Sequence, residues 1–218
     1  MIDKFVPDVA AALDGIADGA VVLLAGFANG MPEKLAEGLM QQGARDLTLV
    51  ANSGGREDGP IADLLRSGRV RKLVCSFVRA TSVAGRRFAA GDLELEIVPQ
   101  GTLAERIRAA GAGVQAFFTP TAADTILAEG RETRVINGRN CLLEYPIFAD
   151  VALVDAWEAD RWGNLTHRES ARNFNPIMAM AAKLTVVQTQ HVVTLGDIPP
   201  ANVHTPGVFV NRVVHVPA

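Results

Sequence analysis

The sequence predicts an α/β fold built on an open, mostly parallel β-sheet with helices on both faces. Short apolar runs alternate along the chain with segments whose apolar residues recur every three or four positions, the spacing of an amphipathic helix. Such alternation of strands with helices is typical of parallel sheets. Several apolar runs also lack a regular change between polar and apolar residues, as expected of strands that are buried on both faces.

Six apolar runs are predicted to be strands, and four segments between them are predicted to be helices. The strands are expected at residues 21–26, 46–51, 72–77, 93–99, 151–157 and 184–189. The helices are expected at residues 32–42, 59–68, 102–111 and 170–183. Pro32 suits the first turn of its helix, where the missing N–H leaves no hydrogen bond unmade.

One segment departs from the strand–helix alternation. Asn137-Gly138 lies between two extended runs, and this dipeptide favours the tight turn of a hairpin. A small antiparallel excursion is therefore expected near residues 133–145. No linker, repeat or change of composition divides the chain, so we expect one domain of residues 1–218.

Charge and hydropathy argue against nucleic-acid and membrane partners. The formal net charge is −3 and the pI is about 5.8, so no overall positive field attracts nucleic acid or an anionic membrane. No apolar stretch approaches the roughly 18 residues of a membrane span. Acidic residues stand among the apolar ones at the N-terminus, which is unlike a signal peptide. A soluble, cytoplasmic protein is expected.

The cysteines and histidines indicate no metal site. Cys75 and Cys141 lie in apolar surroundings and form no CxxC pair, so we expect buried free thiols in a reducing cytosol. The histidines are scattered near the C-terminal part without metal spacing, and no GxSxG motif is present. The residues alone therefore offer no metal ligands and no evident nucleophile.

Four loops follow predicted strands and are the candidates for a shared site. They span residues 26–31, 52–59, 77–85 and 99–102, and three of them combine glycine with a polar amide. In open parallel sheets, ligands bind beyond the carboxyl ends of the strands, where such loops lead into helices.

The first loop contains Gly26, Phe27, Asn29 and Gly30, just before the helix that Pro32 opens. Free N–H groups at a helix start favour anions, and glycines permit a close approach of the backbone. The loop matches neither the dinucleotide motif GxGxxG nor the P-loop motif GxxxxGK[ST]. An anion site and a plain strand–helix turn both remain open at this point.

The amide side chains at two other strand ends are candidate hydrogen-bond donors. Asn52, before Ser53, could hold a carbonyl or carboxylate, or could form an Asx turn. Gln100 could stabilise an oxyanion, or could be a solvated loop residue. Thr102 is expected to cap the following helix. The chain therefore resembles half of an active site.

Several long stretches then point to a family. Residues 18–32, 45–55, 98–125, 160–182 and 203–214 are similar to the A (alpha) chains of class I coenzyme A transferases, and the stretch "VPQGTLAERIRAAGAGVQAFFTPTAADT" is unusually specific. The resemblance covers nearly the whole chain. It is strongest to the enzymes that transfer CoA between succinyl-CoA and 3-oxoacids such as 3-oxoadipate.

This resemblance implies a two-subunit enzyme, expected to be an α2β2 heterotetramer. In such enzymes the acyl-CoA thioester is attacked by a glutamate of the B subunit, and covalent intermediates follow in ping-pong order. CoA is then a substrate thioester, and no permanently bound cofactor is expected. The resemblance assigns Gln100 as the oxyanion donor and Asn52 to positioning of the acyl group or carboxylate.

The resemblance also implies a set of residues that contact CoA or substrate. These are Gly26, Phe27, Asn29, Gly30, Ser53 and Gly101. Two departures from the family pattern concern the same region. A glycine is replaced by Ala25 in a loop that is one residue shorter, and Ser53 replaces the second asparagine of a pair. Both changes are expected to border the acyl pocket and to affect substrate choice.

Three alternatives remain beside the 3-oxoacid transferase. The same family includes enzymes for acetate and other short-chain acids. A sugar-phosphate isomerase or sensor shares this type of sheet, but it needs basic residues at strand ends, and only Arg56 and Arg79 lie near the loops. A structural or regulatory chain without activity is the third.

Overall fold

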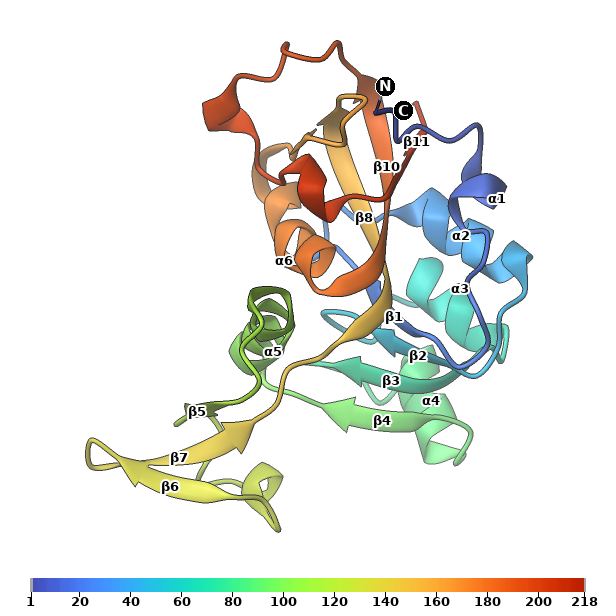
Figure 1. Cartoon of the computed structure of the whole chain (residues 1–218). Helices are drawn as coiled ribbons and strands as arrows, with labels where there is room; N and C mark the ends of the chain where they lie inside the picture. The colour runs from blue at the N-terminus through green and yellow to red at the C-terminus, as the bar shows by residue number, and fades with distance from the viewer. Residues whose placement is uncertain (1, 218) are drawn as a thin grey trace.

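The computed structural model describes residues 2–217, and its main sheet has the predicted parallel architecture (Figure 1). The strand order is β11-β10-β8-β1-β2-β3-β4, and every neighbouring pair in this order is parallel. A short strand β9 pairs antiparallel with β8. The bounds are β1 Val21–Leu24, β2 Leu47–Val50, β3 Val70–Cys75, β4 Glu94–Ile97, β8 Ala149–Ala159, β9 Leu165–Thr166, β10 Ala182–Val192 and β11 Arg212–His215.

Helices cover both faces of this sheet, as the apolar strands require. One face packs against the first four helices, and the other packs against the last two (Figure 1). The helices are α1 Val9–Ala12, α2 Glu33–Gln42, α3 Pro60–Arg66, α4 Val83–Ala89, α5 Gln100–Ala112 and α6 Asn175–Met180. Leu24 belongs to the first core and Leu23 to the second, because successive strand residues point to opposite faces.

A small antiparallel sheet projects from the main body, at the lower left of Figure 1. Its order is β5-β7-β6, with bounds Phe117–Thr119, Arg139–Glu144 and Thr133–Ile136. Asn137 and Gly138 form the turn with φ of 50° and 73°, the left-handed values that a tight hairpin needs. The predicted excursion near residues 133–145 is confirmed.

The predicted helix at residues 170–183 is wrong. The segment instead contains a 3₁₀ turn at Glu169–Arg172, the short helix α6 and the start of β10 at Ala182. Pro176 lies in the first turn of α6, because a proline further inside a helix would remove a hydrogen bond and clash with the preceding turn. Asn173, with φ of 7° and ψ of −112°, breaks the chain direction before it.

Two other expectations also need correction. Thr102 does not cap α5, because that helix already begins at Gln100, and Thr102 is a buried residue of its first turn. Residues 77–85 were expected to be a loop, but α4 begins at Val83. Ser82 caps it by accepting a hydrogen bond from Gly85 N–H at 3.3 Å, a Ser N-cap signal that the sequence carries.

The two cysteines match the prediction, since Cys75 and Cys141 are both free and buried. Burial raises the pKa of the Cys75 thiol to about 11, which makes it a poor nucleophile. Among residues 2–217, no helix is both long enough and apolar enough to cross a bilayer.

The packing of α5 against α6 gives a stability prediction. A Cβ at Gly111 would lie 2.6 Å from the Met180 Cβ, whereas a Cβ at Gly101 of the same helix would meet nothing within 4 Å. Gly→Ala normally stabilises a helix by up to about 1 kcal/mol. We expect Gly111→Ala to lower the melting temperature and Gly101→Ala to leave it unchanged or raise it. Equal shifts for the two variants would contradict the close α5–α6 contact.

Candidate active site

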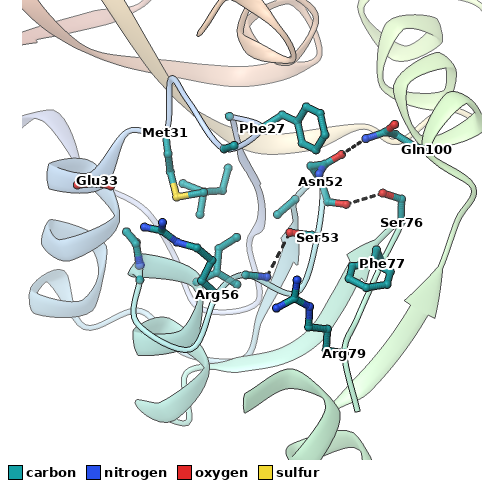
Figure 2. A pocket seen from close by; sticks show the side chains of 18 residues that line it. Phe27, Met31, Glu33, Asn52, Ser53, Arg56, Ser76, Phe77, Arg79 and Gln100 are labelled. Carbon is teal, nitrogen blue, oxygen red and sulfur yellow. Dashed lines mark hydrogen bonds between the residues drawn. The ribbon is translucent and has the colours of Figure 1, made fainter. Parts of the chain in front are cut away.

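A cavity of about 560 Å³ lies beyond the carboxyl ends of β1, β2 and β3 and is called the main cavity here (Figure 2). Its volume is within the range of roughly 300–1,000 Å³ typical of small-molecule sites. All four predicted loops contribute to it. The polar and aromatic lining residues are Phe27, Glu33, Asn52, Ser53, Arg56, Ser76, Phe77, Arg79 and Gln100.

Gln100 and Asn52 meet at one end of this cavity (Figure 2). The Gln100 Nε2 donates to the Asn52 Oδ1 at 2.5 Å. This bond uses one of the two Nε2 protons of Gln100. The other Nε2 proton and the two Nδ2 protons of Asn52 can still donate to a ligand. Two amides from distant parts of the chain thus form one set of neutral hydrogen-bond donors.

The start of α5 adds a positive field at the same point. Gln100 is its first residue, and the first intrahelical acceptor, Pro99 O, receives its bond from Leu103 N–H at 2.8 Å. The N–H groups of the first helical turn therefore lack helical acceptors. Because no acidic residue lies in that turn, the helix dipole favours negative charge beside the Gln100 amide.

The backbone that carries Asn52 is fixed by β3. Ser76 donates two hydrogen bonds to Asn52 O, from Oγ at 2.5 Å and from N–H at 3.0 Å. Gly54 N–H donates to Phe77 O at 2.8 Å. The two strand ends are therefore joined, and the Asn52 side chain keeps one position relative to Gln100.

The first loop is a tight turn with unusual backbone angles. Phe27 and Asn29 exchange both backbone hydrogen bonds, at 3.1 and 2.7 Å, with Ala28 between them at a φ of 62°. Gly26 has a φ of 109°, and a Cβ there would lie 2.9 Å from the Met31 Cα. Gly26, Phe27 and Ala28 line the main cavity, and Phe27 is exposed.

Asn29 and Gly30 are not among the residues that line the main cavity, and they attach the loop to the segment before α6. The Asn29 Nδ2 donates to Ser170 Oγ at 2.9 Å. A Cβ at Gly30 would lie 2.5 Å from Ala171 O, so only glycine fits this contact. In this chain, these two residues are therefore placed to hold the loop, and their contact with a ligand stays a prediction.

The loop depends on Asn175, which the sequence analysis did not single out. Its side chain is completely buried, and its Nδ2 donates to Gly30 O at 2.9 Å and to Ala171 O at 2.8 Å. Its Oδ1 accepts from Asp155 N–H of β8 at 2.8 Å. One amide thus connects the glycine loop, the 3₁₀ turn and the central sheet. Its place directly before Pro176 was the only local signal.

A second buried group joins β8 and β10 to the start of α2. The Gln188 Nε2 donates to Asp155 Oδ1 at 2.9 Å, and the Gln188 Oε1 accepts from the N–H groups of Lys34 and Leu35 at 3.1 and 3.3 Å. Gln188 therefore caps α2 from a neighbouring strand. Burial raises the pKa of the Asp155 carboxyl to about 6.

His167 is a structural residue of the same region. It is buried, with Nδ1 2.9 Å from Asp155 O and Nε2 2.9 Å from Thr205 Oγ1. Burial lowers its pKa to about 4. The described residues include no cluster of three potential metal ligands.

Ala25 does not border the cavity, contrary to expectation. It is fully buried in the core on the side of α5 and α6, and its N–H donates to Leu153 O at 3.1 Å. Leu24 and Gly26 on either side line the cavity, since alternate residues of an extended chain face opposite ways. Ser53 does line the cavity, so this departure does border the site.

A smaller groove of about 300 Å³, called the side groove here, adjoins the main cavity between α5 and α6. Phe27 and Gln100 line both hollows, and Gly101 lines the groove. Apart from Gln100 and Asn173, its lining consists of apolar residues and glycine. The Gln100 amide can therefore be approached from two sides.

The coenzyme A transferase family model matches residues 6–216. This chain belongs to that family. It is 52% identical to the A chain of the 3-oxoadipate CoA-transferase of Pseudomonas putida, over 99% of this chain and 95% of that protein. It is 46% identical to the A chain of a probable succinyl-CoA:3-ketoacid coenzyme A transferase of Bacillus subtilis, over 91% of this chain and 84% of that one.

The fold is also that of known transferases. The acyl-CoA transferase of Escherichia coli O157:H7, solved as a thioester complex with CoA, superposes with a TM-score of 0.86 at 20% identity. The match covers 99% of this chain and 47% of that one, so this chain spans about half the length of the E. coli enzyme. Membership of the family favours CoA transfer over the sugar-phosphate alternative.

The strained residue in the glycine loop gives a second stability prediction. A left-handed conformation costs a non-glycine residue about 1–2 kcal/mol, and glycine avoids this cost. We expect Ala28→Gly to stabilise the protein by about 0.5–1 kcal/mol after the greater chain entropy of glycine is included. Ala89→Gly, at the exposed last residue of α4, is the control: it has no left-handed strain to relieve and should not stabilise the protein. Urea unfolding measures both, and destabilisation by Ala28→Gly would contradict the strain.

The buried carboxyl of Asp155 gives a pH prediction. Its pKa of about 6, against 3.8 when unfolded, means that folding favours the protonated form. Asp155 therefore lowers stability progressively as the pH rises from about 4 to 6. Asp155→Asn keeps the acceptor for Gln188 and removes this penalty. At pH 8 we expect it to be more stable than wild type by about 2–3 kcal/mol.

The comparison of urea unfolding at pH 8 and pH 4 tests this effect. The difference between the two proteins should disappear near pH 4, where both side chains are neutral. Protonation of His167 destabilises both proteins as the pH falls from about 6.5 to 4, so it cancels in the difference. A difference that does not change with pH would exclude the buried charge as its cause.

Proposed function

We propose that this chain is the A subunit of a 3-oxoacid CoA-transferase, which moves CoA between succinyl-CoA and 3-oxoadipate or acetoacetate. The observation that carries this proposal is the Gln100–Asn52 amide pair at the start of α5. Neutral donors in a positive field suit the oxyanion that forms when a thioester is attacked. The names of the sequence relatives support the substrate class.

We propose that the nucleophile comes from a B subunit, in keeping with the family reaction. Glu33 is the only carboxylate among the described lining residues, and Figure 2 places it on α2, across the cavity from Gln100. A chain that spans 47% of the E. coli transferase leaves room for a second subunit of similar size. An α2β2 heterotetramer, with residues 1–218 as one A-subunit domain, follows from this proposal. The buried free thiols suit a cytoplasmic location.

In the proposed reaction, the partner's glutamate attacks the carbonyl carbon of succinyl-CoA. The carbonyl oxygen becomes an oxyanion held by the Gln100 amide, and collapse expels the CoA thiolate and leaves an acyl-glutamyl anhydride. The thiolate attacks the glutamyl carbonyl and releases succinate, which leaves a glutamyl–CoA thioester. The 3-oxoacid carboxylate then reverses these steps and takes the CoA.

Each residue of this chain then has a defined task. Asn52 Oδ1 holds the Gln100 amide in one orientation, and the amide group of Asn52 contacts the acyl oxygen or carboxylate. Gly26, Phe27 and Ser53 border the acyl group in the main cavity, while Gly101 borders the side groove. Asn29 and Gly30 are assigned to the same site through the loop that they hold.

Co-expression with the chain encoded by the neighbouring gene tests the function. The purified complex should transfer CoA from succinyl-CoA to 3-oxoadipate or acetoacetate. Borohydride should inactivate it only after incubation with acyl-CoA, with the modified glutamate on the partner, and Glu33→Gln should not change this. Transfer by the lone chain, or modification that depends on Glu33, would overturn the assignment. Transfer to acetate alone would support the short-chain alternative.

Replacement of the oxyanion donor gives a catalytic prediction. Loss of one such donor typically costs about 2.7–4 kcal/mol of barrier, so Gln100→Ala should lower kcat about 10²–10³-fold. Gln100→Glu has the same shape but cannot donate when ionised, and it should lose a similar factor. Gln115→Ala, on an exposed glutamine just after α5, is the control and should keep wild-type kcat. A Gln100→Ala enzyme with full turnover would remove the oxyanion role.

A further inference from the structure

Two arginine side chains line the main cavity without a partner among the residues that the structure describes. Arg56 follows β2 and Arg79 follows β3. Within residues 2–217, neither guanidinium donates a hydrogen bond or forms an ion pair. A guanidinium carries several donors in a planar fork that matches a carboxylate, so two of them in a ligand cavity point to an anionic ligand group.

Arg56 forms no ion pair with its acidic neighbour Glu57, because Glu57 pairs with two other arginines. Glu57 is adjacent in sequence, but its Oε1 already accepts from Arg66 at 3.1 Å and from Arg86 at 2.6 Å. These bonds, that of Arg86 first, lower the pKa of the Glu57 carboxyl. The adjacent acid is thus neutralised by arginines of α3 and α4, and among residues 2–217 Arg56 forms no ion pair.

The backbones that carry both arginines are fixed, although the guanidinium groups are free. Gly55, with a φ of 77°, packs so closely on α3 that a Cβ would lie 2.8 Å from the Ile61 Cβ. The Arg79 carbonyl accepts from Ser82 N–H at 3.0 Å and Ser82 Oγ at 2.7 Å. Fixed attachment points reduce the entropy lost when the side chains bind a ligand.

The main cavity therefore has two chemically different ends. Figure 2 shows Gln100 and Asn52 toward one end, and Arg56 and Arg79 toward another, with Phe27 and Phe77 among the residues around them. The two arginines outweigh the single acid Glu33, so the lining is positive overall. Apolar walls strengthen the attraction between a guanidinium and an anion.

We propose that Arg56 and Arg79 bind the second, non-reacting carboxylate of a dicarboxylic acyl group while its reacting carbonyl lies at Gln100. This inference rests on the proposed function and narrows its substrate class. Succinyl and 3-oxoadipyl groups each have such a carboxylate, whereas the acetoacetyl group has none. The arginine pair thus selects dicarboxylic acids over monocarboxylic ones.

The test compares two acceptor acids on the complex with the partner subunit. In ping-pong kinetics, kcat/KM for an acceptor reports only the half-reaction of that acceptor, so the succinyl-CoA donor does not enter. Arg56→Gln and Arg79→Gln should each lower the ratio of kcat/KM for 3-oxoadipate to kcat/KM for acetoacetate by about 10- to 100-fold. The corresponding lysine variants should recover part of the loss.

The matched control is Arg71→Gln, an exposed arginine of β3 that pairs with Glu94 away from the cavity. Its ratio should equal that of the wild type. Equal losses for both acids in the Arg56 and Arg79 variants would mean that these residues bind a phosphate of CoA, and this would overturn the proposal. An unchanged ratio would overturn it as well.

A binding measurement separates failure of this inference from failure of the proposed function. Adipate should raise the melting temperature of the wild-type complex more than butyrate does, and Arg56→Gln/Arg79→Gln should abolish the difference. A wild-type complex that transfers no CoA but is stabilised more by adipate than by butyrate would contradict only the proposed function. An active complex that the two acids stabilise equally would contradict only the arginine assignment.

Discussion

The parallel pairing of β1 with β2 and with β8 is the constraint on which the rest of the site depends. Leu23 pairs with Val50 on one side and with Ala152 on the other, so these strands end at one edge of the sheet. Helices bury both faces, so the strands are mostly apolar. The loops beyond their carboxyl ends are open to solvent and can carry polar groups, and amides and arginines from distant segments meet there.

Buried polar side chains connect the loops at this edge to the strands of the sheet. Asn175 connects the glycine loop to β8, and Gln188 connects β8 through Asp155 to the start of α2. Loss of either amide would leave buried donors and acceptors unpaired, at a cost of about 1–3 kcal/mol for each group. This network explains how a short loop keeps Ala28 in a left-handed conformation next to the cavity.

The sequence predicted the features that depend on local patterns. Apolar spacing and turn residues predict six strands of the main sheet, the helices α2, α3 and α5, and the hairpin. The amides Asn52 and Gln100 follow the ends of β2 and β4. The features that the sequence did not predict depend on contacts between residues that are distant in the sequence. The bond from Asn175 to Gly30 O joins segments that are more than a hundred residues apart, and no spacing rule reveals it. The break at Asn173 and Pro176 was readable in principle, but apolar spacing concealed it.

The position of Ala25 shows the same limit more sharply. A residue beside a functional loop was expected to face the ligand, yet strand alternation turns it into the core and turns its neighbours toward the cavity. Arg56 presents the opposite case. The identity and position of this arginine were visible, but whether it is free depends on Arg66 and Arg86, which reach Glu57 only in the folded chain.

The distribution of charge in the cavity suits a reaction in which a carboxylate is both reactant and product. An arginine at the reacting carbonyl would bind the free acid strongly and would stabilise the ground state as much as the transition state. In the proposed reaction, the neutral amides of Gln100 and Asn52, aided by the α5 dipole, would bind the free carboxylate less strongly than an arginine would. Their hydrogen bonds would strengthen in the transition state, where negative charge concentrates on one oxygen. The remote carboxylate keeps its charge throughout, so full cations there contribute binding and selectivity without slowing the chemical step. The separation of amides from arginines along the cavity therefore suits the proposed transfer between two dicarboxylic acids.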